Sequence, residues 1–299
     1  MGNMLYIDAQ TGISGDMTVA ALLDLGADAE GLKKVLKSLN VDGFDINISR
    51  VKKAGLDCCD FDVVLDHDHE NHDHDMEYLY GHDHEHHHDH EHHHDHEHHH
   101  HEHHHDHEHH HDHEHHHDHE HHHHEHRGFY DIKKIIDDSA LSERAKAIAI
   151  RIFEIIAYAE AKAHGEDFEN VHFHEVGAVD SIVDVISVAY AIDNLDIEEV
   201  VVPFLCEGKG SVRCQHGILP IPVPAVTNIV AEHGIILNIQ NTYGEMVTPT
   251  GAAIVAAIKT SDKLPRSMKI LKAGLGAGKR TYERPGILRL MLIQAVDRD

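Results

Sequence analysis

The chain has 299 residues, with 25 Lys and Arg, 53 Asp and Glu and 40 His, giving a formal net charge of −28. This acidic balance offers no basic surface for nucleic acid and no polybasic membrane anchor, so it favours a small-molecule or metal partner. No signal-like or spanning apolar segment occurs, and the four cysteines include no Cys-x-x-Cys pair. We therefore expect a soluble cytoplasmic protein without disulfides.

The first part of the chain predicts alternating strands and helices. A short apolar run closed by glycines precedes a segment of helical spacing, and two alternating segments flank a turn at Gly55. The two alternating segments are expected to form a hairpin. The expected strands cover 4–9, 44–51 and 61–65, and the expected helices cover 17–25 and 29–39.

Residues 67–126 form a run of 35 His and 19 Asp or Glu, without Lys or Arg. Together with Asp66 it holds twenty acids, so the rest of the chain has a balance of only about −8. Most of the run repeats Glu-His-His-His-Asp-His, which has no apolar surface to bury. We therefore expect it to be disordered without metal and inserted into one domain made of residues 1–66 and 127–299.

The composition of this run predicts a metal-loading segment. Imidazole is a preferred ligand of Ni, Zn and Cu, and carboxylates can complete a coordination shell or orient a ring. A purification tag and a solvated linker are alternative interpretations, although tags are terminal and free of acids. The candidate ligands within the repeats are His86, His92, His98, His104, His110, His116 and His122.

After the run, helices are again interleaved with strands. The expected helices cover 131–138, 142–164, 178–195, 225–232 and 251–259. The expected extended segments cover 172–176, 199–205, 210–214, 235–239, 268–273 and 288–294. We expect 199–205 to pair with 210–214 across a glycine turn, and 268–273 to pair with 288–294. The fold class is therefore mixed α/β or α+β, with helices packed on a mixed sheet and hairpins.

Two glycine-containing helix starts could bind an anion. In the segment 8–16, the N–H groups near Ser14 and Gly15 could hold a phosphate, and Asp8 and Asp16 could hold a divalent ion. Thr250 and Gly251 offer a second such helix start. The alternative for the first segment is ordinary capping of the helix by Asp16 or Ser14. For the second segment, simple helix initiation is an equally good explanation.

The segment 171–184 crowds candidate metal ligands. His172 and His174 would face the same side of an extended segment, with Glu175 following, whereas Asp180 and Asp184 would share a helix face. Two imidazoles with one or two carboxylates could hold a transition metal. The alternative is that Asp180 caps a helix and a histidine is buried in the core.

Two further segments contain chemically reactive residues. Cys214 and His216, one residue apart, provide a soft thiolate and an imidazole that suit Ni, Zn or Cu, although buried packing of Cys214 is an alternative. Residues 274–279 read Gly-Leu-Gly-Ala-Gly-Lys, but Ala273 and Arg280 break the nucleotide-loop pattern. We expect a glycine-rich hairpin loop there, with Lys279 and Arg280 available to an anion.

Four segments together resemble the LarC family of nickel-insertion proteins: 8–16, 172–184, 214–222 and 247–252. An internal histidine-rich loop is also like that family. The resemblance implies nickel insertion into pyridinium-3,5-bisthiocarboxylic acid mononucleotide, by a nickel chelatase or cyclometallase of the lyase class. The product is the nickel-pincer nucleotide cofactor of lactate racemase, so apo lactate racemase is an expected recipient.

The resemblance also implies CTP hydrolysis with Mn²⁺ or Mg²⁺. Full-length family members carry a C-terminal portion associated with CTP, in some members as a separate chain or a frameshift product, and this chain ends at Asp299. It is therefore expected to load nickel and to need that portion for insertion. On this hypothesis the metal ligands are His172, His174, Cys214 and His216, and a general base is Asp180, Asp184 or Glu175.

Two rival functions rest on the same residues. A nickel storage or delivery metallochaperone would need the histidine run but no chemistry of its own. A zinc or copper buffer would use the same imidazoles, because affinity order alone does not select nickel.

Overall fold

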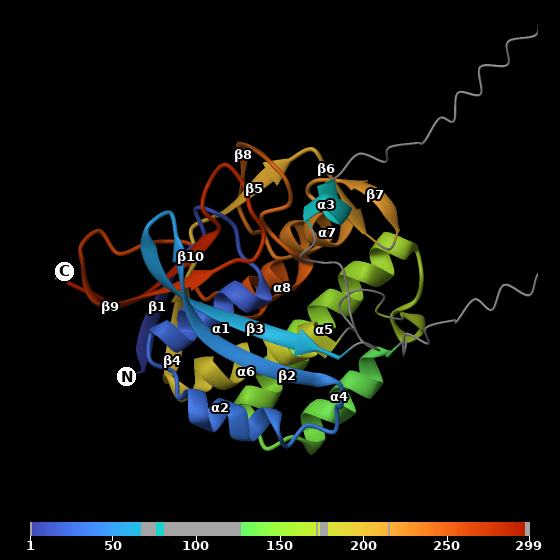
Figure 1. Cartoon of the computed structure of the whole chain (residues 1–299), viewed down its shortest axis with the longest axis horizontal. Helices are drawn as coiled ribbons and strands as arrows, with labels where there is room; N and C mark the ends of the chain where they lie inside the picture. Colours follow the sequence, from blue (N-terminus) through green and yellow to red (C-terminus); the bar gives the residue numbers. More distant parts are fainter. Residues whose placement is uncertain are drawn as a thin grey trace, which may run out of the picture. The chain divides into compact units, whose positions relative to one another are not determined.

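The computed structural model describes residues 2–66, 76–80, 127–171, 173, 179–214 and 216–296. The described residues before and after the histidine run belong to one compact unit. They form a mixed α/β domain, as the sequence predicts (Figure 1). The run itself, with its seven candidate histidines, lies outside the described residues, as do His172, His174 and Glu175.

The main sheet has six strands in the order β2-β3-β9-β10-β1-β4. Strands β1 and β10 pair antiparallel, β1 and β4 pair parallel, and the hairpin β2–β3 meets β9 through Cys59 and Gly276. The predicted hairpin and the predicted pairing of β9 with β10 are confirmed. The strands are β1 (Asn3–Asp8), β2 (Phe44–Lys53), β3 (Leu56–Leu65), β4 (Ile197–Val201), β9 (Met268–Ala277) and β10 (Ile287–Ala295).

Two small sheets lie outside the main sheet. Strand β5 pairs parallel with β8, and β6 pairs antiparallel with β7. The predicted pairing of 199–205 with 210–214 is therefore wrong. Pro203 separates β4 from β5, and the chain turns back at Gly217, whose positive φ of 94° permits the tight β6–β7 turn. These strands are β5 (Leu205–Lys209), β6 (Ser211–Cys214), β7 (Gly217–Pro220) and β8 (Leu237–Tyr243).

The helices form where capping residues and apolar spacing predict them. The long helix α5 begins after Ser142, whose hydroxyl accepts from the Ala145 N–H, and it ends at Gly165 in the left-handed conformation. The helices are α1 (Gly15–Asp24), α2 (Ala29–Leu36), α3 (Met76–Tyr80), α4 (Phe129–Asp138), α5 (Glu143–His164), α6 (Val179–Asn194), α7 (Pro224–Glu232) and α8 (Pro249–Ile258), with a short 3-10 turn η1 (Phe168–Asn170).

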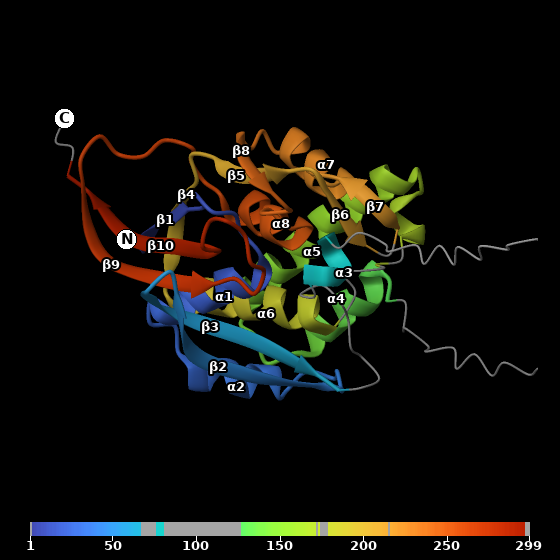
Figure 2. The ribbon, with the colours of Figure 1, turned by 45° about the horizontal axis from the view of Figure 1, so that its top comes forward.

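Helix α1 is central to the packing. It contacts β3 and β9 on one side and α6 on another, and α5 in turn packs against α6, α7 and α8 (Figure 2). Leu22, Ile152, Phe153 and Ile156 are fully buried in the shared core. Burial of such side chains contributes roughly 1.5–3 kcal/mol each, so this core stabilises the packing of the helices against one another.

Residues 274–277 belong to strand β9, so the expected glycine loop is wrong there. A Cβ atom on Gly276 would lie 2.1 Å from the Met17 carbonyl oxygen, and one on Gly274 would lie 2.4 Å from the Ala21 carbonyl oxygen. The glycines therefore let α1 pack directly on the strand. Among the helices of the described residues, none is long and apolar enough to cross a membrane.

Candidate functional site

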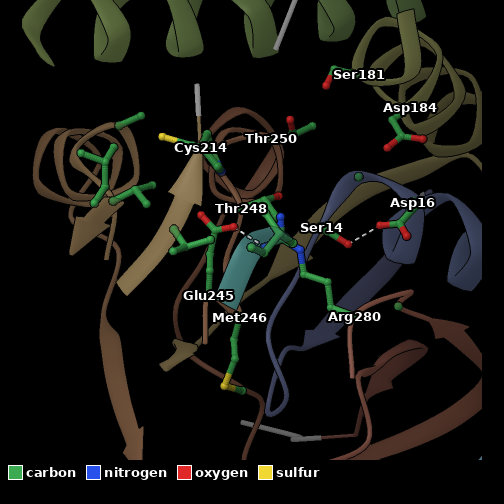
Figure 3. Close-up of a pocket in the computed structure, with 18 of the residues that line it drawn as sticks. Ser14, Asp16, Ser181, Asp184, Cys214, Glu245, Met246, Thr248, Thr250 and Arg280 are labelled. Carbon is green, nitrogen blue, oxygen red and sulfur yellow. Dashed lines mark hydrogen bonds and ion pairs between the residues drawn. The ribbon is translucent and has the colours of Figure 1, made fainter. Parts of the chain in front are cut away.

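A cavity of about 270 Å³ opens where several chain segments meet. Its walls come from the starts of α1, α6 and α8, the end of α5, strand β6 and the segment after β9 (Figure 3). The polar side chains lining it are Thr11, Ser14, Asp16, Glu160, His164, Asp180, Ser181, Asp184, Arg213, Cys214, His216, Glu245, Thr248, Thr250, Lys279, Arg280 and Tyr282. The cavity thus gathers most sequence-predicted site residues that the structure describes.

The starts of helices α1 and α8 lie side by side in the cavity wall. The Ile13 N–H donates to the Met246 carbonyl at 2.9 Å, and the Thr248 N–H donates to the Ile13 carbonyl at 3.1 Å. Both helix ends therefore present their positive dipole ends to one space. Three of the predicted anion-binding residues, Ser14, Gly15 and Thr250, line the cavity. Gly251 does not line it, and its N–H donates to the Thr248 hydroxyl at 3.1 Å.

Three carboxylates approach each other beside α1. Burial raises the pKa of Asp184 well above its ordinary range, the negative charges of Asp16 and Asp180 raise it further, and the charge of Lys279 partly opposes them. Its Oδ1 is buried and has no hydrogen-bond partner among the described residues. A buried carboxyl with a free oxygen and a raised pKa is suited to accept a proton.

Gly15 brings the α1 backbone against Asp184. A Cβ atom at this position would lie 2.4 Å from Asp184 Oδ2, so no other residue fits without displacing the carboxylate. The Asp16 N–H donates to the same carboxylate, and Ser14 Oγ donates to the Asp16 carboxylate. The start of α1 therefore lies directly against the Asp184 carboxylate. Figure 3 shows Ser14 joined to Asp16, with Asp184 on the same side of the view.

Two cationic side chains close another part of the cavity. Lys279 pairs with Asp62 of β3, and Arg280 pairs with the buried Glu245. The Tyr282 hydroxyl donates to the Glu245 carbonyl, and the Glu245 N–H donates to the Tyr80 hydroxyl at 2.9 Å. Arg280 is thus part of a buried network that joins α3 to the segment after β9.

Glu207 is a buried acid that the sequence analysis missed. It is fully buried in β5, and burial raises its pKa to about 7. Its Oε1 accepts from the N–H groups of Gly208, Met246 and Val247 at 2.7, 2.7 and 3.2 Å. The sequence signal that could have found it is an acid placed directly after the apolar run 200–206. Its carboxyl holds the segment that carries Glu245 and Thr248 to the cavity.

The end of β6 places Cys214 and His216 at the cavity, with 3.9 Å between Cys214 Sγ and His216 Nδ1. Cys214 and the carboxylates Asp16 and Asp184 lie at opposite sides of the view in Figure 3. Glu160 and His164 of α5 also line the cavity, and the sequence analysis did not single them out. A histidine and an acid in a helix's last turns are common, so they give little signal.

Not every predicted residue reaches the cavity. Asp8 is buried but pairs with Arg289 of β10, and it is absent from the cavity wall. Within the described ranges, no group of three or more His, Cys, Asp or Glu side chains has the geometry of a formed metal site. The described residues therefore show a cavity with candidate ligands rather than a closed metal centre.

This combination of candidate metal ligands, a buried carboxyl and two helix starts is the set expected of a metal-handling α/β protein. Residues 5–299 match the family model described as nickel insertion protein, and the chain belongs to this family. The resemblance stated above is thereby confirmed.

Curated relatives point the same way. The chain is 48% identical over 98% of its length to the pyridinium-3,5-bisthiocarboxylic acid mononucleotide nickel insertion protein of Alkaliphilus metalliredigens, covering 61% of that protein. It is 37% identical to the protein of that name from Geobacillus kaustophilus, covering 97% of this chain and 59% of that protein. A putative nickel insertion protein of Geobacter sp. (strain M21) is 35% identical, and the match covers 96% of this chain and 60% of that protein. The chain spans about three fifths of these relatives, and no solved structure matches it.

Proposed function

We propose that this chain binds Ni²⁺ and delivers it to pyridinium-3,5-bisthiocarboxylic acid mononucleotide, as the names of its relatives indicate for them. The observation that carries the proposal is a single cavity lined by the soft ligands Cys214 and His216, the buried carboxyl of Asp184 and two helix starts. Nickel needs the soft ligands, a phosphate is bound by the helix starts, and removal of the ring proton needs a base such as the carboxyl.

The substrate phosphate is assigned to the starts of α1 and α8. Ser14, Gly15 and Thr250 line the cavity there, together with Lys279 and Arg280, which are each paired with a carboxylate. Helix N-termini bind phosphate through their N–H groups and dipole. This placement would leave the pyridinium ring between the phosphate site and Cys214.

The chemical step is cyclometallation, a lyase-class reaction. Ni²⁺, held first by Cys214 and His216, forms two bonds to the thiocarboxylate sulfurs and one to a ring carbon. The ring carbon loses its proton to a carboxylate, and nickel remains Ni²⁺ throughout. We assign the base to Asp184, because its pKa is raised by burial and by Asp16 and Asp180. Asp180 remains the alternative among the described carboxylates, whereas Glu175 and the ligands His172 and His174 lie outside the described residues.

CTP with Mn²⁺ or Mg²⁺ does not fit the described residues. Lys279 already supplies a positive charge to Asp16 and Asp184, and Asp8 is paired with Arg289. We assign CTP and its divalent ion to the part of the relatives that lies outside this chain, as a C-terminal portion acting with it. The nickel-pincer product would then pass to apo lactate racemase.

Nickel insertion in vitro tests the proposal. The thiocarboxylated nucleotide, CTP, Mn²⁺ and Ni²⁺ are incubated with this chain alone and with this chain plus a separately made C-terminal portion. Nickel-containing nucleotide formed only in the mixture is the expected result. Tight nickel binding without product in either sample would contradict insertion and favour the non-catalytic metallochaperone.

A further inference from the structure

Four potential metal-binding side chains from two chain segments meet at one wall of the cavity. His164 is the last residue of α5, and Glu160 lies one turn earlier, with Glu160 Oε2 3.5 Å from His164 Nε2. The His164 and His216 rings have centroids 4.7 Å apart. Cys214 Sγ lies 3.9 Å from His216 Nδ1. All four side chains line the cavity.

The chemistry of this group selects a borderline or soft transition metal. Thiolate and imidazole together suit Ni, Zn or Cu, and a carboxylate beside a ring nitrogen fixes the orientation and basicity of a ligating histidine. Cys214 is partly exposed, whereas Cys58, Cys59 and Cys206 are buried. It is therefore the cysteine that a metal in the cavity can reach.

We propose that His164 is a third nickel ligand, forming with Cys214 and His216 an open site at the cavity wall, with Glu160 as the carboxylate that positions the His164 ring. This inference rests on the proposed function, since it names the residues that hold the nickel before transfer. The sequence motif supplies only half of such a site, and α5 supplies the rest from fifty residues earlier in the chain.

An open three-ligand site suits a metal that has to leave. The side chains are not set at coordination geometry as they stand, since no formed three-ligand group occurs in the described part of the chain. His216 is exposed, and its ring already lies close to both Cys214 and His164. A square-planar Ni²⁺ held by three ligands keeps one position for a substrate sulfur. As that Ni–S bond forms, the Ni–Sγ and imidazole bonds break, and the Cys214 thiolate regains a proton from solvent.

The test is a Ni²⁺ titration of the full chain, followed by thiolate-to-nickel charge-transfer absorption. The histidine run has no cysteine, so its bound nickel does not contribute to this signal. Burial raises the pKa of the Cys58, Cys59 and Cys206 thiols, which keeps them protonated. Cys214→Ser should abolish the band, and His164→Ala should shift its midpoint to about tenfold higher nickel or remove it.

Two further variants make the test specific. Glu160→Gln should raise the nickel concentration at the midpoint of the titration roughly 10-fold, because carboxylates that orient a ligating histidine typically contribute 10–100-fold to metal affinity. His233→Ala is the matched control: this histidine follows α7, outside the cavity wall, and its loss should leave the titration unchanged. Circular dichroism of each variant verifies folding.

A titration of His164→Ala that coincides with wild type would overturn the assignment of His164, as would the absence of any band in the wild-type chain. Nickel insertion by the mixture with the C-terminal portion is measured in parallel. If insertion proceeds while the band is absent, the proposed function stands and only the ligand assignment falls. If the band follows the expected pattern but no product forms, the ligand assignment stands and insertion falls.

Discussion

The Met246 N–H donates to Glu207 Oε1 at 2.7 Å, and this hydrogen bond ties a buried acid to the cavity wall. Val247 donates to the same oxygen, while Glu207 Oε2 is buried without a partner among the described residues. Burial raises the pKa of Glu207 from 4.5 to about 7, although the three N–H groups favour the ionised form. The domain therefore carries a buried group that changes charge near neutral pH.

Replacing Glu207 by Gln should remove part of the pH dependence of stability. The folded pKa is raised, so the contribution of Glu207 to the unfolding free energy is largest below pH 4.5 and is lost as pH rises toward about 7. Between pH 5 and 8, wild type should lose roughly 2 kcal/mol more than Glu207→Gln. Denaturant unfolding at several pH values measures this difference.

Glu199→Gln on β4 is the control, because Glu199 is exposed and should keep the wild-type pH slope. The titration of the histidine run is common to all three proteins and cancels in the comparison. Equal slopes for wild type and Glu207→Gln would contradict the prediction.

Asp184→Asn should slow nickel insertion, measured with this chain plus the separately made C-terminal portion, at least ~100-fold. General-base catalysis typically contributes 10²–10⁴-fold to a rate. The variant's folding should persist, because the amide removes a buried charge facing Asp16 and Asp180. The wild-type rate should rise with pH through the raised pKa of Asp184, since only the ionised carboxylate accepts a proton. Asp138→Asn, at an exposed site ending α4, should keep the wild-type rate and pH profile. A full rate with Asp184→Asn would exclude this base.

Local patterns predicted the elements and two of the three expected strand pairings, and failed for the third. Alternation and a glycine turn predict the hairpin, and Ser142 and Gly165 define the ends of α5, because these signals involve neighbouring residues. A turn at Gly210 would pair 210–214 with the preceding strand, whereas a turn at Gly217 pairs it with the following one. Both glycines have positive φ. Local sequence does not decide between them.

The candidate site was likewise predicted where its residues lie in local motifs, and missed where they meet through long-range contacts. Asp16, Asp184, Cys214 and Thr250 were named from motifs and do line one cavity. Glu160 and His164 were missed because they are chemically relevant only where α5 ends beside the β6–β7 turn, which is a long-range contact. Asp8 was named from its motif, yet its carboxylate faces Arg289 across the β1–β10 pair.

Gly15→Ala should destabilise the domain and disturb the cavity together. The new Cβ would lie 2.4 Å from Asp184 Oδ2, and such overpacking typically costs about 1–3 kcal/mol. Gly128→Ala is the matched control, since a Cβ there lies no closer than 3.6 Å to the neighbouring atoms considered. Thermal unfolding compares the two variants. Equal melting temperatures would show that the α1 start has room for a side chain.

Glu245→Gln should cost about 3 kcal/mol of unfolding free energy, because it removes the carboxylate charge that faces the largely buried Arg280 guanidinium. Arg280→Met should cost a similar amount. The double variant should be less destabilised than the sum, since the two single substitutions remove the same ion pair. Denaturant unfolding of the four proteins gives the coupling energy, and simple additivity would contradict a buried pair.

Nickel loading of the whole chain should collapse near pH 5, because imidazole coordinates only when neutral and has an ordinary pKa of about 6.5. Nickel retained after desalting is measured by elemental analysis at pH 7.5 and pH 5, and returning the acid-treated sample to pH 7.5 with fresh Ni²⁺ should restore loading. Irreversible loss would indicate unfolding instead of ligand protonation. Undiminished nickel at pH 5 would move the main binding capacity away from histidine, toward the carboxylates that remain ionised there.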